Sequence, residues 1–254
     1  DAMIVTKGGL IWNEASTVLG RDSHRRHLET VLEGSLRRLQ TDYVDLYLIH
    51  WPDPNTPLDD VAETLQSFVA SGKARAIGVS NFTGAQLRAL AASLRTSRLV
   101  ANQVSFNLFD RRWAADTFDT CRELGIGVMA YGPLAHGLLA GAVTRETVFD
   151  ATDWRASGVI FGQPLLTPEN RPRNHKVVNC LREVAAAKGI TLAQLAIVWV
   201  LRHSQVTVAL VGARTEREIT EAIDATEVRI SDPEIAAIEE IMAHAAGMTN
   251  ALPT

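Results

Sequence analysis

The sequence predicts an α/β protein folded as a (β/α)8 TIM barrel. Short β-rich runs alternate with longer amphipathic runs almost throughout the chain. Most of the short runs are continuously apolar, as strands of a parallel sheet are when both faces are covered. Neither a glycine-rich dinucleotide fingerprint nor a phosphate-loop lysine motif follows the first strand, which disfavours an open doubly wound sheet. We therefore expect repeated strand–helix–strand units with right-handed crossovers.

Six strands are expected, and they share an apolar, β-rich composition; they span residues 3–7, 44–50, 74–80, 100–107, 126–131 and 206–212. The amphipathic runs predict helices over residues 24–39, 58–71, 84–94, 111–124, 175–187, 192–202, 215–225 and 233–244. Thr191 supplies an N-cap for one of these helices. Ser231 or Asp232 supplies one just before Pro233, which suits the first helical turn.

Residues 141–174 have no regular period and are rich in Pro, Gly and Arg. We expect this segment to be an excursion over one mouth of the barrel. Six strands are fewer than the eight that close a barrel of this kind, and the chain opens directly on an apolar strand. The expectation is a single barrel domain over residues 1–254 that lacks its first two strand–helix units.

Composition excludes several classes of function. The chain has 254 residues and a net charge of −4, so it lacks the basic face that nucleic-acid binding requires. No apolar run approaches the ~20 residues of a membrane span, and no signal-peptide pattern opens the chain. Cys121 and Cys180 lie far apart and outside any Cys/His cluster. They predict a reduced, cytoplasmic protein without a metal site.

The stretch DLYLIHWPD at residues 45–53 carries the first candidate for chemistry. An apolar strand ends in His50, and Pro52 stops the strand because it has no N–H to donate. By the two-residue period, His50 shares the inward face with Leu46 and Leu48. The carboxyl ends of barrel strands are where such folds place catalytic groups. A packed, hydrogen-bonded histidine is the alternative interpretation, and it is the commoner one.

An ordered set of motifs then points to a family. They are VTK at residues 5–7, SLRRL at 35–39, HWP at 50–52, GKARAIGVSNF at 72–82, NQ at 102–103, YGPL at 131–134, GLL at 137–139 and GAR at 212–214. With these segments in this order, the chain resembles the aldo-keto reductase superfamily of NAD(P)H-dependent (β/α)8 barrels. The YGPL and GAR segments are most similar to the bacterial stress-type branch, which is akin to potassium-channel β subunits.

The resemblance implies two catalytic residues. Members transfer a hydride from nicotinamide to a carbonyl carbon, and a tyrosine, assisted by a lysine paired with an aspartate, donates the proton. Lys7 matches that lysine, and His50 matches the histidine that orients the carbonyl oxygen. The tyrosine and aspartate precede the lysine in the family, whereas residues 1–6 contain no tyrosine. Lys7 could instead be a solvated strand-end lysine.

The resemblance also implies a set of cofactor-binding residues, which are Ser80, Asn81, Gln103, Tyr131, Gly132, Leu134, Arg155, Gly212, Arg214 and Glu221. The first three would bind the nicotinamide carboxamide, and Tyr131 would stack on the ring. Arg155 and Arg214 would bind an adenosine 2′-phosphate, which favours NADP(H). NAD(H) stays an alternative, because Glu218 places an extra carboxylate near that phosphate. Turn chemistry at Ser80 and Asn81 and core packing at Tyr131 are the structural alternatives.

For the parent protein, the expected function is NADPH-dependent reduction of an aldehyde or ketone, a small-molecule carbonyl substrate, to an alcohol. Residues 1–254 are expected to lack the tyrosine that donates the proton and its aspartate partner. We expect no nucleic-acid or membrane partner. One alternative is a non-catalytic regulatory subunit that binds a nicotinamide cofactor. Another is a barrel isomerase or aldolase acting on a phosphorylated substrate, but that function would leave Ser80, Gln103 and Tyr131 unexplained.

Overall fold

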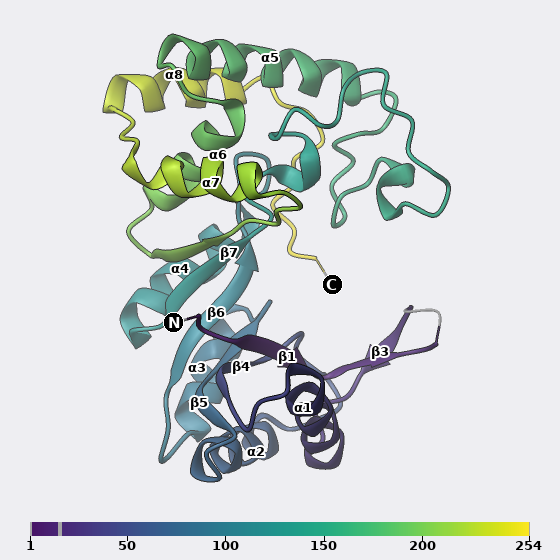
Figure 1. Ribbon diagram of the computed structural model, residues 1–254, viewed down its shortest axis with the longest axis vertical. Helices are drawn as coiled ribbons and strands as arrows, with labels where there is room; N and C mark the ends of the chain where they lie inside the picture. The colour runs from purple at the N-terminus through teal and green to yellow at the C-terminus, as the bar shows by residue number, and fades with distance from the viewer. Residues whose placement is uncertain (1, 15–16, 254) are drawn as a thin grey trace. The chain divides into compact units, whose positions relative to one another are not determined.

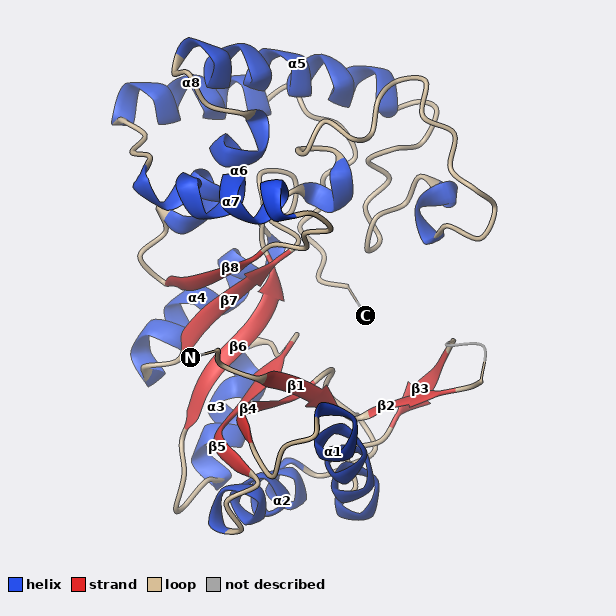
Figure 2. Cartoon of the chain, viewed as in Figure 1, coloured by secondary structure: helices blue, strands red, loops and turns tan. Residues whose placement is uncertain are grey.

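The computed structural model describes residues 2–14 and 17–253, and in it strands alternate with helices along the chain (Figure 1, Figure 2). The described chain forms two compact units. Unit 1 contains the described residues up to Val104 together with Asp116–Met129. Unit 2 contains Ser105–Ala115 and the described residues from Ala130 onward. Each unit is described by itself below.

Six strands form one sheet in the order β1-β4-β5-β6-β7-β8. Their bounds are Val5–Gly8, Val44–Ile49, Ala74–Ser80, Leu99–Ser105, Gly127–Tyr131 and Val206–Leu210. The pairs β1–β4, β4–β5 and β5–β6 are parallel. The six predicted strands are confirmed, each end within two residues of its expected place. Parallel strands alternating with helices are the arrangement of the (β/α)8 class.

Helices α1 (Arg25–Leu39), α2 (Leu58–Ala70) and α3 (Gly84–Ser93) belong to unit 1. In Figure 1, α1 lies beside β1, and α2 lies beside β5 and α3. Tyr47 of β4 is fully buried, and its ring packs edge-on against Phe68 of α2 with centroids 5.2 Å apart. Side chains alternate along a strand, so Leu46 and Leu48 occupy the opposite face. The helix α4 spans Arg112–Leu124.

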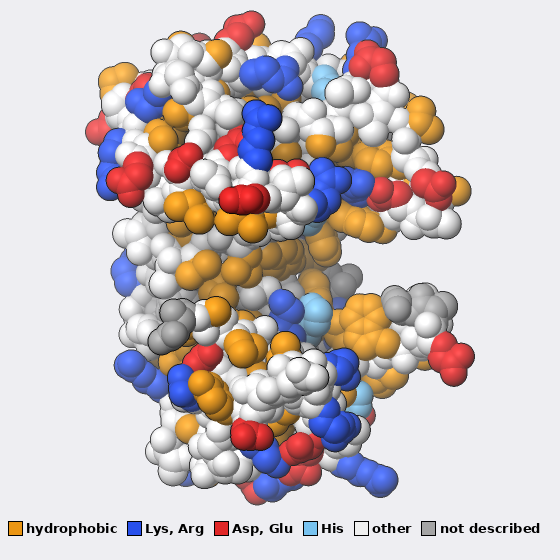
Figure 3. All heavy atoms as spheres, in the orientation of Figure 1, with side chains coloured by type: hydrophobic (Ala, Val, Ile, Leu, Met, Phe, Trp, Pro, Cys, Tyr) orange, Lys and Arg blue, Asp and Glu red, His pale blue; other side chains and the backbone are white. Residues whose placement is uncertain are grey.

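A two-stranded antiparallel hairpin, β2 (Leu10–Trp12) and β3 (Val18–Arg21), was not predicted. Its strands have only three and four residues, too few for a clear periodic pattern. The hairpin directly follows β1. At its base, the Asp22 N–H donates to the carbonyl of Gly9, the residue between β1 and β2, at 3.0 Å. Trp12 of this hairpin is 53% exposed, and Figure 3 shows hydrophobic side chains on the hairpin at the right of the view.

In unit 2, helices α5 (Arg171–Ala187), α6 (Leu192–Leu201), α7 (Glu216–Asp224) and α8 (Asp232–Met242) follow one another. The expected helix starts are confirmed by capping boxes at Thr191–Gln194 and Ser231–Glu234. Ser231, not Asp232, is the N-cap residue. α5 begins four residues earlier than the expected 175, because Pro172 suits its first turn. Helix α6 is apolar on nearly every face and correspondingly buried.

Residues 141–170 are irregular, as expected, apart from a short 3-10 turn at Trp154–Ser157. A buried ion pair anchors part of this excursion within unit 2. Arg112 and Asp110, with side chains 2% and 5% exposed, pair at 2.8 Å. Arg112 also donates to the carbonyls of Phe161 and Ala251, both at 3.0 Å. This pair joins the excursion to the C-terminal segment.

Among the described residues, no single helix is both long and apolar enough to span a bilayer. Helices α5 and α6 reach that length and apolarity only when taken together, and the chain bends by 88° between them.

Candidate active site

In unit 1, polar side chains meet at the carboxyl ends of neighbouring strands. The Lys7 ammonium, on β1, donates to Gln103 Oε1, on β6, at 2.8 Å. The Ser80 hydroxyl, at the end of β5, donates to the Gln103 carbonyl at 2.8 Å. Ser80 and Gln103 are buried. The parallel register places Lys7 opposite Leu48 and Ser80 opposite Gln103, which is why residues distant in sequence become neighbours.

Asn81 joins this cluster to His50. Its side-chain amide donates to the His50 carbonyl at 3.1 Å and to Ser80 Oγ at 3.0 Å. Its own N–H donates to the Gln103 carbonyl at 2.9 Å. Asn81 has φ +61°, the left-handed region, which asparagine tolerates better than most residues. The His50 N–H donates to the Gly8 carbonyl at 2.9 Å, so His50 is held at the end of β1 as well. We call Lys7, His50, Ser80, Asn81 and Gln103 the strand-end cluster.

The electrostatics of the strand-end cluster favour a neutral histidine. Burial, and then the positive charge of Lys7, lowers the pKa of His50 to about 4. Burial also lowers the pKa of Lys7. At neutral pH the His50 ring is therefore uncharged and carries one N–H donor and one acceptor nitrogen. Such a ring can orient a carbonyl oxygen without adding a charge of its own.

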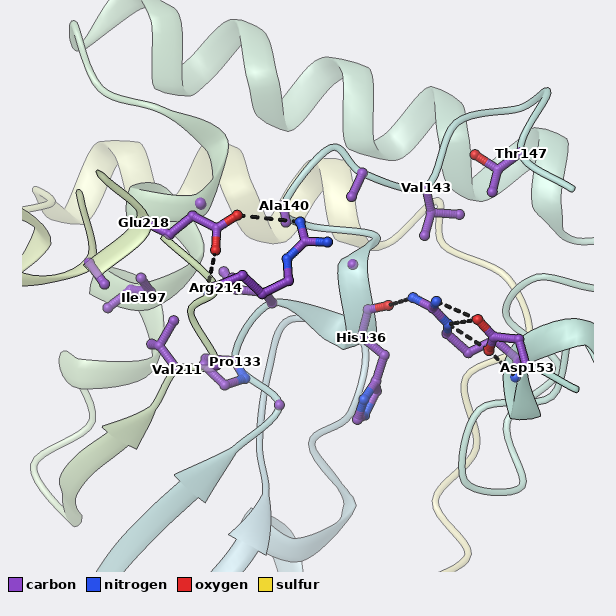
Figure 4. A pocket seen from close by; sticks show the side chains of 18 of the residues that line it. Pro133, His136, Ala140, Val143, Thr147, Asp153, Ile197, Val211, Arg214 and Glu218 are labelled. Atoms are coloured by element: carbon purple, nitrogen blue, oxygen red, sulfur yellow. Dashed lines mark hydrogen bonds and ion pairs between the residues drawn. The ribbon is translucent and has the colours of Figure 1, made fainter. Parts of the chain in front are cut away.

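In unit 2, a cavity of about 870 Å³ contains most of the remaining candidates. Of the predicted residues, Gly132, Leu134, Arg155, Gly212, Arg214 and Glu221 line it. They come from the loop after β7, the excursion, and the segment from the end of β8 into α7 (Figure 4). The cavity has the size of a small-molecule or cofactor pocket.

Arg214, at the α7 side of this cavity, is paired with a carboxylate. Its Nη2 lies 3.3 Å from Glu218 Oε1, and its backbone N–H donates to Glu218 Oε2 at 2.6 Å (Figure 4). That backbone bond is the largest cause that holds the pKa of Glu218 below its usual range, so the carboxylate is charged at neutral pH. The Arg214 side chain is 88% exposed, which leaves the pair weak.

Arg155, whose partner Asp153 lies across the view from Arg214 in Figure 4, is held more firmly. Its Nε and Nη2 donate to Asp153 at 2.9 and 2.6 Å, and its Nη1 donates to the His136 carbonyl at 3.0 Å. The guanidinium also lies 4.8 Å from the centre of the Phe149 ring. The pKa of Asp153 falls to about 2 because of its hydrogen bonds from Arg155. Arg155 thus links the excursion to the loop after β7.

Tyr131 ends β7 but is not among the residues that line the cavity. Its ring packs against Phe161 with centroids 6.0 Å apart. His136, which the sequence did not single out, does line the cavity. It has φ +54°, and its ring lies 5.1 Å from both Trp154 and Phe161. No sequence signal marks His136, whereas the spacing of Arg214 and Glu218 at i and i+4 does predict their pairing.

The chain belongs to the aldo/keto reductase family, whose sequence profile matches residues 1–243. It is 35% identical over 216 residues to aldo-keto reductase YhdN of Bacillus subtilis (strain 168), covering 84% of this chain and 62% of that protein. It is 32% identical over 230 residues to L-glyceraldehyde 3-phosphate reductase of Escherichia coli (strain K12), covering 88% of this chain and 65% of that protein. The chain therefore spans less than two thirds of these curated relatives.

A solved structure of a related protein has the same fold as this chain. The glycerol dehydrogenase of Gluconobacter oxydans superposes with a TM-score of 0.87 at 32% identity, covering 100% of this chain and 75% of that one. The resemblance drawn from the strand-end motifs is confirmed at the level of the family and of the (β/α)8 fold.

Proposed function

We propose that the protein reduces an aldehyde or ketone to an alcohol with NADPH, and that residues 1–254 belong to a single barrel domain. The observation that carries the proposal is the strand-end cluster, in which Lys7 and His50 stand beside three amide and hydroxyl side chains at the ends of parallel strands. Family membership supports the class of reaction. A small-molecule carbonyl compound would be the substrate.

Each residue of the strand-end cluster has a proposed role. A bound nicotinamide would supply the hydride. The neutral ring of His50 would orient the carbonyl oxygen through a hydrogen bond, and the Lys7 ammonium would stabilise negative charge on that oxygen. The proton that completes the alcohol would come from the tyrosine that the family resemblance implies. Ser80, Asn81 and Gln103 offer amide and hydroxyl groups that match a carboxamide, which needs both donors and acceptors.

The cavity of unit 2 carries groups that would suit the phosphates of a nicotinamide cofactor. Gly132 and Leu134 bring backbone to its wall, and Gly132, with φ +65°, has a conformation that suits glycine. Arg214 supplies a cation for a 2′-phosphate, which supports NADP(H). Arg155 would serve chiefly to hold the loop after β7, because its donors are engaged. NAD(H) stays the alternative cofactor, because Glu218 and Glu221 bring negative charge to the same cavity.

The cellular setting is also a proposal. Cys121 and Cys180 are free thiols, and they agree with a reduced, cytoplasmic location.

The test is oxidation of NADPH in the presence of a panel of aldehydes and ketones, measured with the protein as its gene encodes it. We expect carbonyl-dependent oxidation that is lost in Lys7→Met and His50→Ala. Lys73→Met, which removes a half-exposed lysine paired with Glu33, is the matched control. Quenching of tryptophan fluorescence by NADPH measures cofactor binding separately. Binding without turnover of any carbonyl would overturn the proposed reaction.

A further inference from the structure

Arg21 lies where the strand-end cluster meets the β2–β3 hairpin. The chain runs from Lys7 through Gly8 and Gly9 directly into the hairpin, where Arg21 is the register partner of Leu10. Two backbone hydrogen bonds join the segments here, from His50 N–H to the Gly8 carbonyl and from Asp22 N–H to the Gly9 carbonyl. Arg21, Lys7 and His50 therefore belong to segments that are hydrogen-bonded to one another at one end of the sheet.

The Arg21 side chain is positioned by the residues that follow His50. Its guanidinium carbon lies 4.9 Å from the centre of the Trp51 ring, and its Nη1 donates to the Pro52 carbonyl at 3.3 Å. Stacking occupies the face of the guanidinium plane and leaves its edge of N–H donors for a planar anion. The indole thus orients the arginine without neutralising it.

No carboxylate of the described residues forms an ion pair with Arg21, although Asp22 follows it in sequence and Asp53 follows Pro52, whose carbonyl Arg21 contacts. Asp22 pairs with His24 Nδ1 at 2.9 Å. Asp53 accepts from the Ser23 N–H at 2.9 Å and from the Thr56 hydroxyl at 2.6 Å. Lys7 is on β1, the strand that leads through Gly9 into this hairpin, so two cationic side chains belong to adjoining segments of the chain. Such a concentration of positive charge favours an anionic ligand.

We propose that Arg21 recognises an anionic group, a carboxylate or a phosphate, on the carbonyl substrate, and that Trp51 holds its guanidinium in place. This inference rests on the proposed function, because it names the substrate class of that same reaction. The preferred substrate is then an aldehyde or ketone that carries a negative charge.

Two pairs of aldehydes test the inference with the protein as its gene encodes it. Succinic semialdehyde against butanal isolates a carboxylate, and glyceraldehyde 3-phosphate against glyceraldehyde isolates a phosphate. The unmodified protein should favour the anionic member of at least one pair. In Arg21→Met the ratio of kcat/KM for the anionic over the neutral member should fall about ten- to hundredfold, as expected for a lost charge-assisted hydrogen bond. In Arg21→Lys the same ratio should fall less, because lysine keeps the positive charge.

Arg25→Met is the matched control. It removes one positive charge four residues away, from an arginine already paired with Glu29 and Glu63, and it should leave both ratios unchanged. Thermal melts check that each variant folds. If the unmodified protein reduces neutral and anionic aldehydes but Arg21→Met does not change either ratio, this inference alone fails. If it reduces none of the four, the proposed function fails, and the inference fails with it.

Discussion

The candidate residues of the two units are held in different ways. In unit 1, Lys7, Ser80 and Gln103 lie on strands, and a parallel ladder sets their spacing. They bond mainly to one another and to backbone carbonyls. In unit 2, Arg155 and Arg214 lie on irregular segments, and each is paired with a carboxylate close by in sequence.

This difference shows for which residues the sequence predicts the position in the fold. A residue at the end of a parallel strand has its position set by the backbone, so the motif predicts which edge of the sheet it reaches. A residue on a loop can bind a ligand only when its polar atoms are not already engaged by other side chains. Arg155 shows the consequence, since its hydrogen bonds to Asp153 and to the His136 carbonyl leave it a role in holding the loop.

Replacing Lys7 is expected to have the largest effect on activity. Lys7→Met removes the cation that hydrogen-bonds Gln103, and kcat for carbonyl reduction should fall by about 10²- to 10⁴-fold. Steady-state oxidation of NADPH measures the change. Lys73→Met should stay within about twofold of the unmodified protein, because this half-exposed pair lies outside the strand-end cluster and contributes little. Comparable losses in both variants would show that the effect is not specific to the strand-end cluster.

Two glycine substitutions contrast the packing of the units. A Cβ at Gly8, the last residue of β1, would lie 2.0 Å from Tyr47 Oη and 2.7 Å from Val31 Cγ2. Gly8→Ala should therefore lower the free energy of unfolding by about 1–3 kcal/mol. Gly212→Ala, in the cavity wall of unit 2, meets no atom within 4 Å and should change it by less than about 0.5 kcal/mol. Urea denaturation of both variants measures the two changes in the free energy of unfolding. Equal changes would contradict the expected difference between the two positions.

His50 should make stability depend on pH in a defined window. Its pKa is about 4 in the folded protein, below the ordinary value of 6.5, so the folded state favours the neutral ring. The stabilisation is complete above pH 6.5 and is lost as the pH falls through about 4. Between these values the melting temperature of the unmodified protein should fall more steeply than that of His50→Gln.

The charge of Lys7 is one cause of the lowered pKa of His50, so Lys7→Met should raise that pKa. NMR titration of the His50 ring protons measures the change. A His50 pKa that stays unchanged in Lys7→Met would remove the charge of Lys7 as a cause.

The smallest expected effect concerns the cofactor. Glu218→Gln releases Arg214 from its ion pair and removes a negative charge from the cavity of unit 2. Because Arg214 is 88% exposed, we expect only about two- to fivefold tighter binding of NADPH relative to NADH. Isothermal titration of both cofactors measures it. Glu216→Gln changes the same charge in the first turn of α7, outside the cavity lining, and should not alter the ratio.

The sequence by itself determined the repeated strand–helix order and the residues at the strand ends. Continuous apolar runs mark buried parallel strands, and breaks such as Pro52 mark where they stop, so His50 and Ser80 were recognisable before the structure. The capping signals at Thr191 and Ser231 were equally local, because a cap involves only residues three apart.

Only the tertiary structure decided what those residues touch. The bond from Lys7 to Gln103 crosses 96 positions, and the stacking of Arg21 on Trp51 needs a hairpin too short for a periodic pattern. The same holds for His136, whose aromatic neighbours Trp154 and Phe161 come from the excursion. Local patterns encode the conformation of neighbouring residues, whereas contacts between distant ones depend on how the elements pack.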